Sequence, residues 1–263
     1  MRAIELSSGA VVALIFLFTS GLAGAVQADP LGCTKGDGLH IRKVCFEDVA
    51  GAPIYGHHVL GDTPEWDELT VFWGERTRPR TDGQGGAATT LLLDHVYEDV
   101  LPRLFDVDLD GEDEIVVVQS HFEKGARLVV YDTNAALVEI AGPYIGTRHR
   151  WLAPVGAADL DGDGHIEIAY VDRPHLAKTL RIWRFKDGTL TEAAMASGYS
   201  NHKIGWDFIP GGIRDCGNGA EMILATGNWS HIVAARFDGT TITTRTLGRY
   251  EGAKSVDAAL RCP

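Results

Sequence analysis

Hydrophobic positions along the chain fall into short runs rich in Val, Ile, Leu, Tyr, Phe and Trp, separated by stretches of Gly, Asn, Asp and Pro. Runs of this length and composition predict β-strands joined by turns. A repeated unit is visible, because four glutamates each precede a β-rich run, a polar loop and usually a second β-rich run. These are Glu68, Glu114, Glu167 and Glu221, at spacings of 46, 53 and 54 residues.

A strand-rich unit that recurs about every 50 residues is typical of β-propeller blades. The inner strand of each blade is expected just before its glutamate, over residues 102–108, 151–159 and 207–215. A fifth blade can be assembled from the chain ends, with 255–262 as its inner strand and 39–49 as its partner. We therefore expect an all-β fold, a β-propeller of five blades closed by N- and C-terminal strands. Four blades, or a β-sandwich that does not close, are the alternatives.

The first 28 residues have the order of a secretory signal peptide. Arg2 precedes an apolar run over 10–18, and Val26 to Ala28 offers small residues for cleavage after position 28. An uncleaved anchor is disfavoured, because the run is broken at 19–21 and falls short of the roughly 20 apolar residues that a span needs. We expect one domain over residues 29–263, periplasmic or secreted, without stable membrane insertion.

Charge and cysteine content narrow the class of partner and compartment. The net charge of −12 would repel phosphate backbones, so nucleic acid is not an expected partner, and we expect a monomer. Four cysteines in an exported chain predict two disulfides, with three possible pairings. We favour Cys33–Cys45 with Cys216–Cys262, and next the pair Cys33–Cys262 that would tie the two ends together.

Two stretches, here called the first and second acidic loops, combine alternating aspartates, a glycine and a glutamate at one spacing. They contain Asp106, Asp108, Asp110, Gly111 and Glu114, and Asp159, Asp161, Asp163, Gly164 and Glu167. Ca²⁺ takes six to eight oxygen ligands at about 2.3–2.6 Å, and glycine at the sixth position lets the chain turn with φ > 0. An EF-hand would need its acid at position 12 and flanking helices. Here the pattern predicts an ion that locks the turn between two strands; a solvated acidic turn is the alternative.

The two loops, their strand context and their period resemble FG-GAP/VCBS repeats, the calcium-bearing propeller repeats also found in integrin α-chains. The resemblance is strongest over residues 102–132 and 151–185. It implies one Ca²⁺ at Asp106, Asp108, Asp110 and Glu114, and another at Asp159, Asp161, Asp163 and Glu167. The corresponding stretches 213–221 and 61–68 depart from the pattern and are expected to bind no metal.

Loops on the opposite face of such blades are rich in histidine and arginine. The links between blades and the loops joining second and third strands carry His57, His58, His95, His121, His149, His175, His202 and His231. Within them we single out Arg148, His149, Arg150, Trp151, Asp172, Arg173, His175, Lys178 and His202 as candidate ligand-binding residues. A repeated histidine can equally be scaffolding that bonds to a neighbouring turn. The functional alternative is a site for an anionic or sugar-like ligand or a transition metal.

The sequence contains no Gly-x-Ser-x-Gly elbow, no His-Glu-x-x-His and no phosphate loop. The main prediction is therefore an exported, calcium-stabilised propeller that binds a protein or a small anionic or carbohydrate ligand. The alternative is a periplasmic lyase or hydrolase that uses His149, His175 or His202 as acid or base. A purely structural domain with calcium as its only ligand is a third hypothesis.

Overall fold

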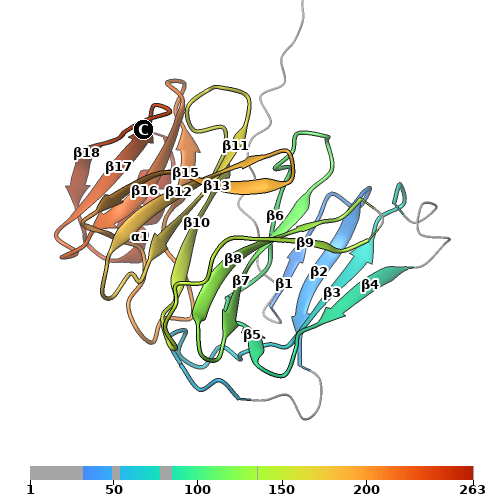
Figure 1. Ribbon diagram of the computed structural model, residues 1–263. Coiled ribbons are helices and arrows are strands. Elements are labelled where there is room, and N and C mark those ends of the chain that lie inside the picture. Colours follow the sequence, from blue (N-terminus) through green and yellow to red (C-terminus); the bar gives the residue numbers. More distant parts are fainter. Residues whose placement is uncertain (1–31, 49–53, 78–84, 135, 263) are drawn as a thin grey trace, which may run out of the picture.

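The computed structural model describes residues 32–48, 54–77, 85–134 and 136–262, which form four antiparallel sheets and one helix (Figure 1). Sheet I contains β1 (Cys33–Lys35), β2 (Ile41–Glu47), β3 (Glu68–Trp73) and β4 (Gly86–Thr90). Sheet II contains β5 (His95–Tyr97), β6 (Arg103–Phe105), β7 (Glu114–His121), β8 (Gly125–Asp132) and β9 (Val138–Ala141). Sheet III contains β10 (Leu152–Ala158), β11 (Ile166–Asp172), β12 (Thr179–Lys186) and β13 (Thr189–Ser197). Sheet IV contains β14 (Tyr199–Ser200), β15 (Gly212–Asp215), β16 (Ala220–Thr226), β17 (His231–Phe237) and β18 (Ile242–Arg249), and α1 (Ala253–Leu260) follows it. The predicted signal peptide, residues 1–28, lies outside the described residues.

The sheets pack face to face in chain order, as blades of a propeller do. Strand β7 shows why, because its side chains alternate between two apolar layers. Ile115 and Val117 join the core shared with sheet I, whereas Val116 and Val118 join the core shared with sheet III. A strand buried on both faces reads in sequence as a continuous apolar run. The predicted all-β, propeller-like fold is therefore confirmed, as are the strands before and after Glu114, Glu167 and Glu221.

The prediction of a fifth blade assembled from the chain ends is wrong in both of its parts. The segment 39–49 contributes β2 to sheet I, where Glu47 lies opposite Glu68 in the register with β3. Most of the segment 255–262 is helical, and its i, i+4 pair Val256 and Leu260 packs on the apolar face of sheet IV. Ala258, Ala259 and Leu260 in this segment favour a helix over a strand.

Both predicted disulfides are present. Cys33–Cys45 joins neighbouring residues of β1 and β2, and Cys216–Cys262 ties the end of the chain to the loop before β16. Disulfides of this kind form and persist in oxidising compartments. Among the described residues no helix is long and apolar enough to cross a membrane.

The inner strand is interrupted in sheets II and IV and continuous in sheet III. Strands β5 and β6 both pair with β7, with residues 98–102 between them, and β14 and β15 both pair with β16 around residues 201–211. Pro102 and Pro210 lie near the ends of these gaps, and a proline cannot donate to a ladder. Glu98, Asn201 and His202 lie in these gaps and are buried.

The segment from Tyr55 to Gly61 lies against these gaps at the end that carries the histidine links. Val59 and Leu60 are buried in the core between sheets II and III, and the carbonyl of Val59 accepts the amide N–H of Gly205 at 3.0 Å. The backbones approach so closely that a Cβ at Gly61 would lie 2.7 Å from the Gly205 carbonyl oxygen. The N-terminal part of the chain therefore contacts sheet IV through this link.

Candidate functional site

The first acidic loop joins β6 to β7 and leaves carboxylate oxygens without partners. Ligand oxygens of Asp106, Asp108 and Glu114 lie within 4.8 Å of one another. One oxygen of Glu114 accepts the amide N–H of Val107 at 2.8 Å, while its other oxygen and Oδ1 of Asp106 are buried without a partner among the described residues. Burial, reinforced by Asp108 and the neighbouring aspartates, raises the pKa of Glu114 to about 8. These unpaired oxygens fit a hard cation, whose charge would keep the carboxylates ionised.

The second acidic loop, between β10 and β11, has the same backbone pattern and a different charge balance. Oδ2 of Asp159 accepts the N–H of Gly164 at 3.0 Å, as Oδ2 of Asp106 accepts that of Gly111. Here, however, Arg184 on β12 donates to Oε1 of Glu167 at 2.6 Å and also pairs with Asp161. The oxygen that is unpaired in the first loop is thus already bonded to a cation.

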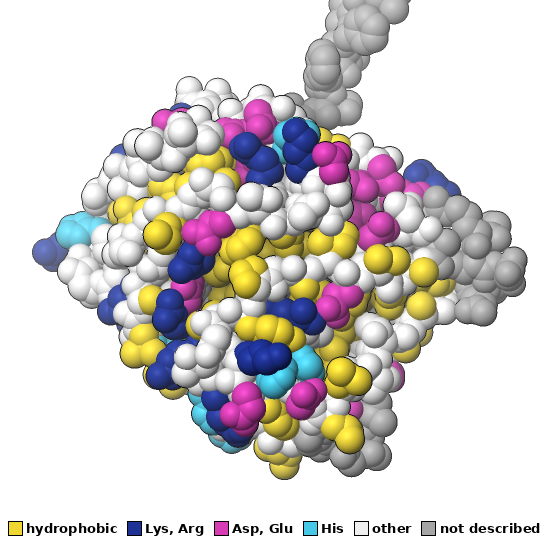
Figure 2. Space-filling model, in the orientation of Figure 1, with side chains coloured by type: hydrophobic (Ala, Val, Ile, Leu, Met, Phe, Trp, Pro, Cys, Tyr) yellow, Lys and Arg dark blue, Asp and Glu magenta, His cyan; other side chains and the backbone are white. Residues whose placement is uncertain are grey.

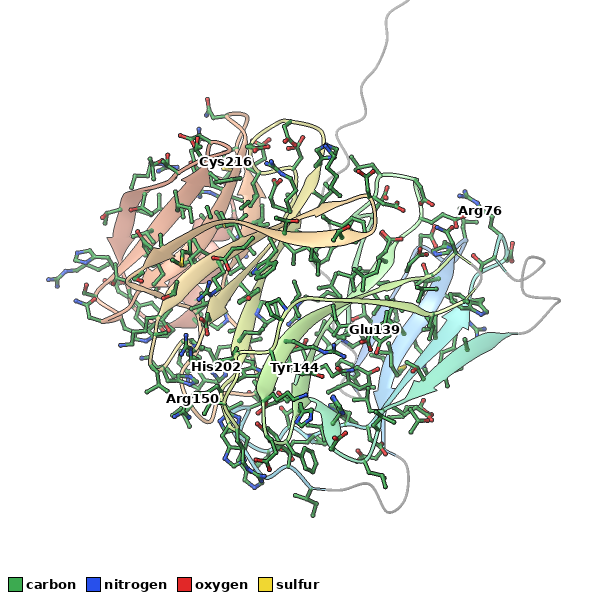
Figure 3. The ribbon with its side chains drawn as sticks, in the orientation of Figure 1. Arg76, Glu139, Tyr144, Arg150, His202 and Cys216 are labelled. Carbon is green, nitrogen blue, oxygen red and sulfur yellow. A yellow bond between two sulfur atoms is a disulfide. The ribbon has the colours of Figure 1, made fainter. Side chains whose placement is uncertain are left out.

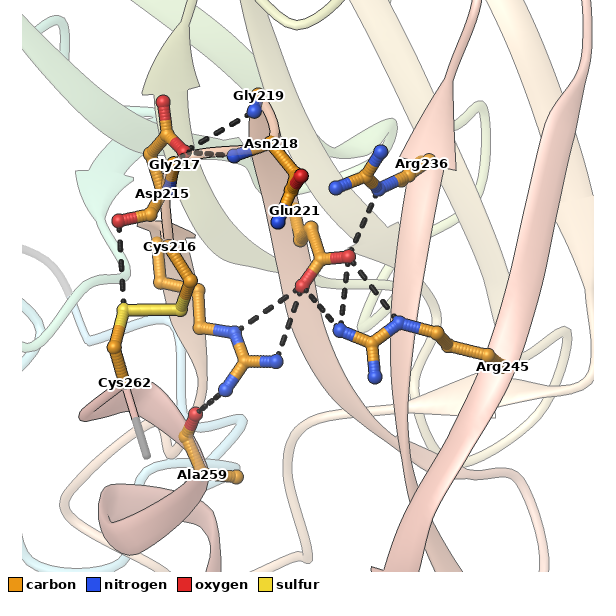
Figure 4. Close-up of a disulfide and its surroundings, with 11 residues drawn as sticks. Asp215, Cys216, Gly217, Asn218, Gly219, Glu221, Arg236, Arg245, Ala259 and Cys262 are labelled. Carbon is orange, nitrogen blue, oxygen red and sulfur yellow. Dashed lines mark hydrogen bonds and ion pairs between the residues drawn. A yellow bond between two sulfur atoms is a disulfide. The ribbon is translucent and has the colours of Figure 1, made fainter.

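Sheet IV carries the same glutamate without the aspartates. Glu221 contacts Arg214, Arg236 and Arg245 at 3.0, 2.8 and 2.8 Å (Figure 4). Burial raises the pKa of this carboxyl, but the hydrogen bonds from the arginines outweigh it and lower the pKa to about 2. The arginines thus bond both oxygens of Glu221.

The histidine links lie at the other end of the molecule, here called the histidine end. Figure 3 shows Arg150 and His202 at this end and Cys216 near the acidic loops, and Figure 2 shows Lys, Arg and His side chains gathered there. His57 Nδ1 lies 2.5 Å from Oε1 of the fully buried Glu98, whose other oxygen accepts Ser120 Oγ at 2.6 Å. Burial raises the pKa of Glu98 despite the hydrogen bond from His57. His149 stacks on His57, with 4.9 Å between the ring centroids.

A chain of hydrogen bonds fixes the protons of two further histidines. His202 Nε2 lies 2.9 Å from the carbonyl oxygen of Trp206, so this nitrogen must carry the proton and Nδ1 must accept. His175 Nε2 lies 3.1 Å from His202 Nδ1 and must therefore donate. Nδ1 of His175 is left with a lone pair. Burial, with the nearby His202 and His57, lowers the pKa of His175 to about 4, and burial also lowers the pKa of His202.

The basic candidates differ in what they already contact. Arg173 is paired with Asp172 through two nitrogens, at 2.8 and 3.0 Å, and Lys178 Nζ donates to the carbonyl of Gly227 at 2.6 Å. Arg150 donates to the carbonyl of its neighbour His149 and has no carboxylate partner within the described part of the chain. Arg150 is therefore the candidate cation best placed to meet an anionic group.

Arg148 and Trp151 serve the packing of this end. Arg148 lies over the ring of Tyr55 and contacts Glu123 at 3.5 Å. Trp151 is 2% exposed, and its indole N–H donates to the carbonyl of Glu98 at 2.7 Å. The ring of Trp151 also contacts the ring of His202 edge-on, with 4.9 Å between the centroids. Trp151 therefore contacts both Glu98 and His202.

Aromatic rings continue from His202 toward solvent. Trp206 stacks on Phe208 with centroids 4.8 Å apart and an interplanar angle of 12°, and Phe208 is 42% exposed. Lys203 lies within 4.6 to 5.4 Å of the ring centroids of Trp206, Trp229 and Tyr250. A flat, partly exposed ring next to polar groups is suited to stacking against a sugar.

Two acidic residues and one cavity were not singled out from the sequence, although they belong to the candidate sites at the two ends of the molecule. Glu98 gave no signal, because one glutamate in a short link resembles a surface residue. Asp94 lies 2.6 Å from His95 Nδ1 and 3.5 Å from His121 Nε2. A cavity of about 1390 Å³ opens between sheets III and IV at the end of the acidic loops, where Asp159, Arg214 and Arg236 line it. The alternating aspartates of the second acidic loop could have indicated a polar opening here. Nothing in the sequence indicated that Arg214 would line the same cavity.

Comparison with known proteins bears on the functional prediction. No curated protein matches the sequence. Among solved structures, the chain is similar to CoXyl43, a GH43 β-xylosidase/α-arabinofuranosidase from a compost microbial metagenome. The identity is 15% and the TM-score 0.40, over 84% of this chain and 76% of that chain. The matched protein is by its name a hydrolase, in line with the alternative prediction of a lyase or hydrolase rather than with the predicted binding module. At this TM-score the likeness says nothing of residues or substrate.

The family comparison concerns the two acidic loops directly. The model of the FG-GAP-like repeat matches residues 106–170, which begin at the first acidic loop and end within β11. This stretch contains both loops, the strands β7, β8 and β9 of sheet II, and β10 of sheet III. Residues 106–170 are therefore similar to an FG-GAP-like repeat, as the two acidic loops predicted.

Proposed function

We propose that this chain is an extracytoplasmic lyase or hydrolase whose general base is His175 at the histidine end. The observation that carries the proposal is the hydrogen-bond chain from the Trp206 carbonyl through His202 to His175. It fixes the tautomer that leaves Nδ1 of His175 unprotonated. Its lowered pKa, about 4, keeps that nitrogen a base at neutral and mildly acidic pH. His202 is 0% exposed and acts as a positioning residue.

The His57–Glu98 pair supplies the complementary acid. The Glu98 carboxylate accepts from His57 Nδ1 at 2.5 Å, and the His57 side chain is 17% exposed. In its doubly protonated form His57 would offer the N–H of its other ring nitrogen to a substrate. His57 is among the groups that lower the pKa of His175, after burial and His202. A base and an acid on neighbouring loops can remove a proton from one substrate atom and donate one to the leaving oxygen.

The proposed substrate is an anionic carbohydrate. Arg150 offers a guanidinium for a carboxylate group, and the stacked pair Trp206 and Phe208 offers a face for a sugar ring. In a β-elimination, His175 would take the proton next to that carboxylate while the acid protonates the departing glycosidic oxygen. In a hydrolysis, the same base would activate water.

A panel of acidic polysaccharides, such as polygalacturonate and alginate, tests this proposal. Elimination gives ultraviolet absorbance from the unsaturated sugar, and hydrolysis gives new reducing ends without it. His175→Ala should lower the rate by about 10²–10⁴-fold at unchanged melting temperature. His202→Ala should instead raise the pKa of His175, so that on acidification the rate begins to fall at a higher pH. His231→Ala, at the same end but bonded to Ser230, is the matched control. No turnover on the panel, or full activity in His175→Ala, would reject the proposal.

We also propose that Ca²⁺ binds the first acidic loop and stabilises the fold. Asp106, Asp108 and Glu114, with Asp110 beside them, would hold the ion, and the unpaired buried oxygens of Asp106 and Glu114 support it. Bound there, the ion would lock the turn between β6 and β7. A monomer in the periplasm or outside the cell, which does not bind nucleic acid, fits the disulfides and the acidic charge.

A further inference from the structure

Glu114, Glu167 and Glu221 occupy one structural position, at the start of the second strand of sheets II, III and IV. In two of them one oxygen accepts the amide N–H of the residue seven positions earlier, at 2.8 Å for Glu114 and 2.9 Å for Glu167. At Glu221 that place belongs to Arg214, whose guanidinium bonds the same oxygen. The surroundings of the second oxygen therefore decide what each loop can bind.

The residue on the third strand opposite each glutamate is an arginine in sheets III and IV and an aspartate in sheet II. Glu167 is the register partner of Arg184, and the neighbouring pair Met222 and Ala235 places Arg236 opposite Glu221. In sheet II, the pair Ile115 and Tyr131 places Asp132 opposite Glu114. An acid thus lies across from the first acidic loop, and an arginine lies across from the other two.

Arg184 occupies the centre of the second acidic loop. Its guanidinium pairs with Asp161, with Asp163 at 3.3 Å and with Glu167 at 2.6 Å. Asp159 accepts backbone N–H groups on both oxygens, so all four acids of the loop have donors on both oxygens. The Glu167 and Asp161 side chains are 0% and 5% exposed.

We propose that Arg184 is the resident cation of the second acidic loop, so that the chain binds one calcium ion, at residues 106–114, and none at 159–167. The planar guanidinium presents five N–H donors to oxygens that a metal would otherwise collect. Its backbone is held opposite Glu167 by the β11–β12 ladder, so the charge stays at the loop. A divalent ion at the same oxygens would face that charge at close range.

Calcium titration of the wild-type chain by calorimetry measures the stoichiometry directly. One ion per chain is expected, and two ions would overturn the proposal. Arg184→Gln removes the internal cation and keeps a side chain of similar reach, so the stoichiometry should rise from one to two. A value that stays at one in a folded Arg184→Gln chain would show that the arginine is not what excludes the ion.

Two further variants show which loop binds the ion and keep the proposal testable if Arg184→Gln does not fold. Glu114→Gln, which leaves the second loop untouched, should bind no calcium, and one remaining ion would overturn the proposal. Arg181→Gln is the matched control, because Arg181 is also on β12 and pairs with Asp172 and Glu192, away from the loop. It should keep one ion.

Discussion

In sheets II and IV the second strand begins with a buried glutamate, but the two glutamates have opposite surroundings. Glu114 has an unpaired oxygen, three aspartates in its loop and Asp132 across the strand, whereas Glu221 contacts three arginines. The backbone pattern of the repeat is the same, so the fold tolerates either charge balance. In sheet II an ion that is not part of the chain would balance the acids, whereas sheet IV supplies its own cations.

The largest effect is expected when the internal cations lose their carboxylate. Glu221→Gln should lower the free energy of unfolding by about 3–5 kcal/mol, because Arg214, 8% exposed, keeps a buried charge without its partner. Urea denaturation with calcium and with chelator should give the same loss. Glu192→Gln is the control, since its exposed ion pair with Arg181 contributes about 1 kcal/mol or less. A loss that depends on calcium would break the comparison.

Glu114→Gln should affect stability in opposite directions with and without calcium. At a calcium concentration 100-fold above Kd, binding adds about 2.7 kcal/mol to the wild-type chain, and the variant should lack it. In chelator the variant should be at least as stable as the wild type, because it no longer buries an unpaired carboxylate oxygen. Melting curves of both proteins in calcium and in chelator measure this reversal of their relative stability. A variant that is less stable in chelator too would contradict the role assigned to this oxygen.

The histidine end differs from both loops in its pH response. His175 has a folded pKa of about 4, below its ordinary 6.5, so the unfolded chain binds more protons between these values. The stability it contributes is therefore present above pH 6.5 and is lost as the pH falls toward 4. After allowance for partial exposure, the loss should be about 1–2 kcal/mol. Denaturation of the wild type and of His175→Asn, both in calcium, should show a smaller loss in the variant, in which His202 with its lowered pKa remains.

The smallest effect concerns the fourth position of the acidic loops. Leu109 has a φ of 63° in the first loop, where the second loop has Gly162 at 80°. Leu109→Gly should stabilise the chain by about 0.5–1 kcal/mol, since relief of the left-handed conformation exceeds the added entropy of the unfolded chain. Leu109→Ala keeps a Cβ at the same φ and should change little. Equal effects of Gly and Ala would mean that φ is not the cause.

The strands and the acidic loops could be predicted from the sequence because they depend on local pattern. Alternating or continuous apolar runs, turn residues and the spacing of Asp106 to Glu114 are visible within a few residues of one another. The two favoured disulfides also proved right. The helix at 253–260 was missed because its apolar pair Val256 and Leu260 acquires meaning only when sheet IV is there to pack against.

By itself, then, the sequence determined the strand units, the two acidic turns and the similarity of residues 106–170 to an FG-GAP-like repeat, since each follows from residues close in the chain. Tertiary structure alone decided what those turns face: Arg184 is 17 positions from Glu167 and meets it only through the β11–β12 register. It likewise decided that His175 and His202, 27 positions apart, share a hydrogen bond. The charge balance of each loop and the position of each proton depend on contacts between distant strands and loops, and the amino-acid sequence alone does not specify these contacts.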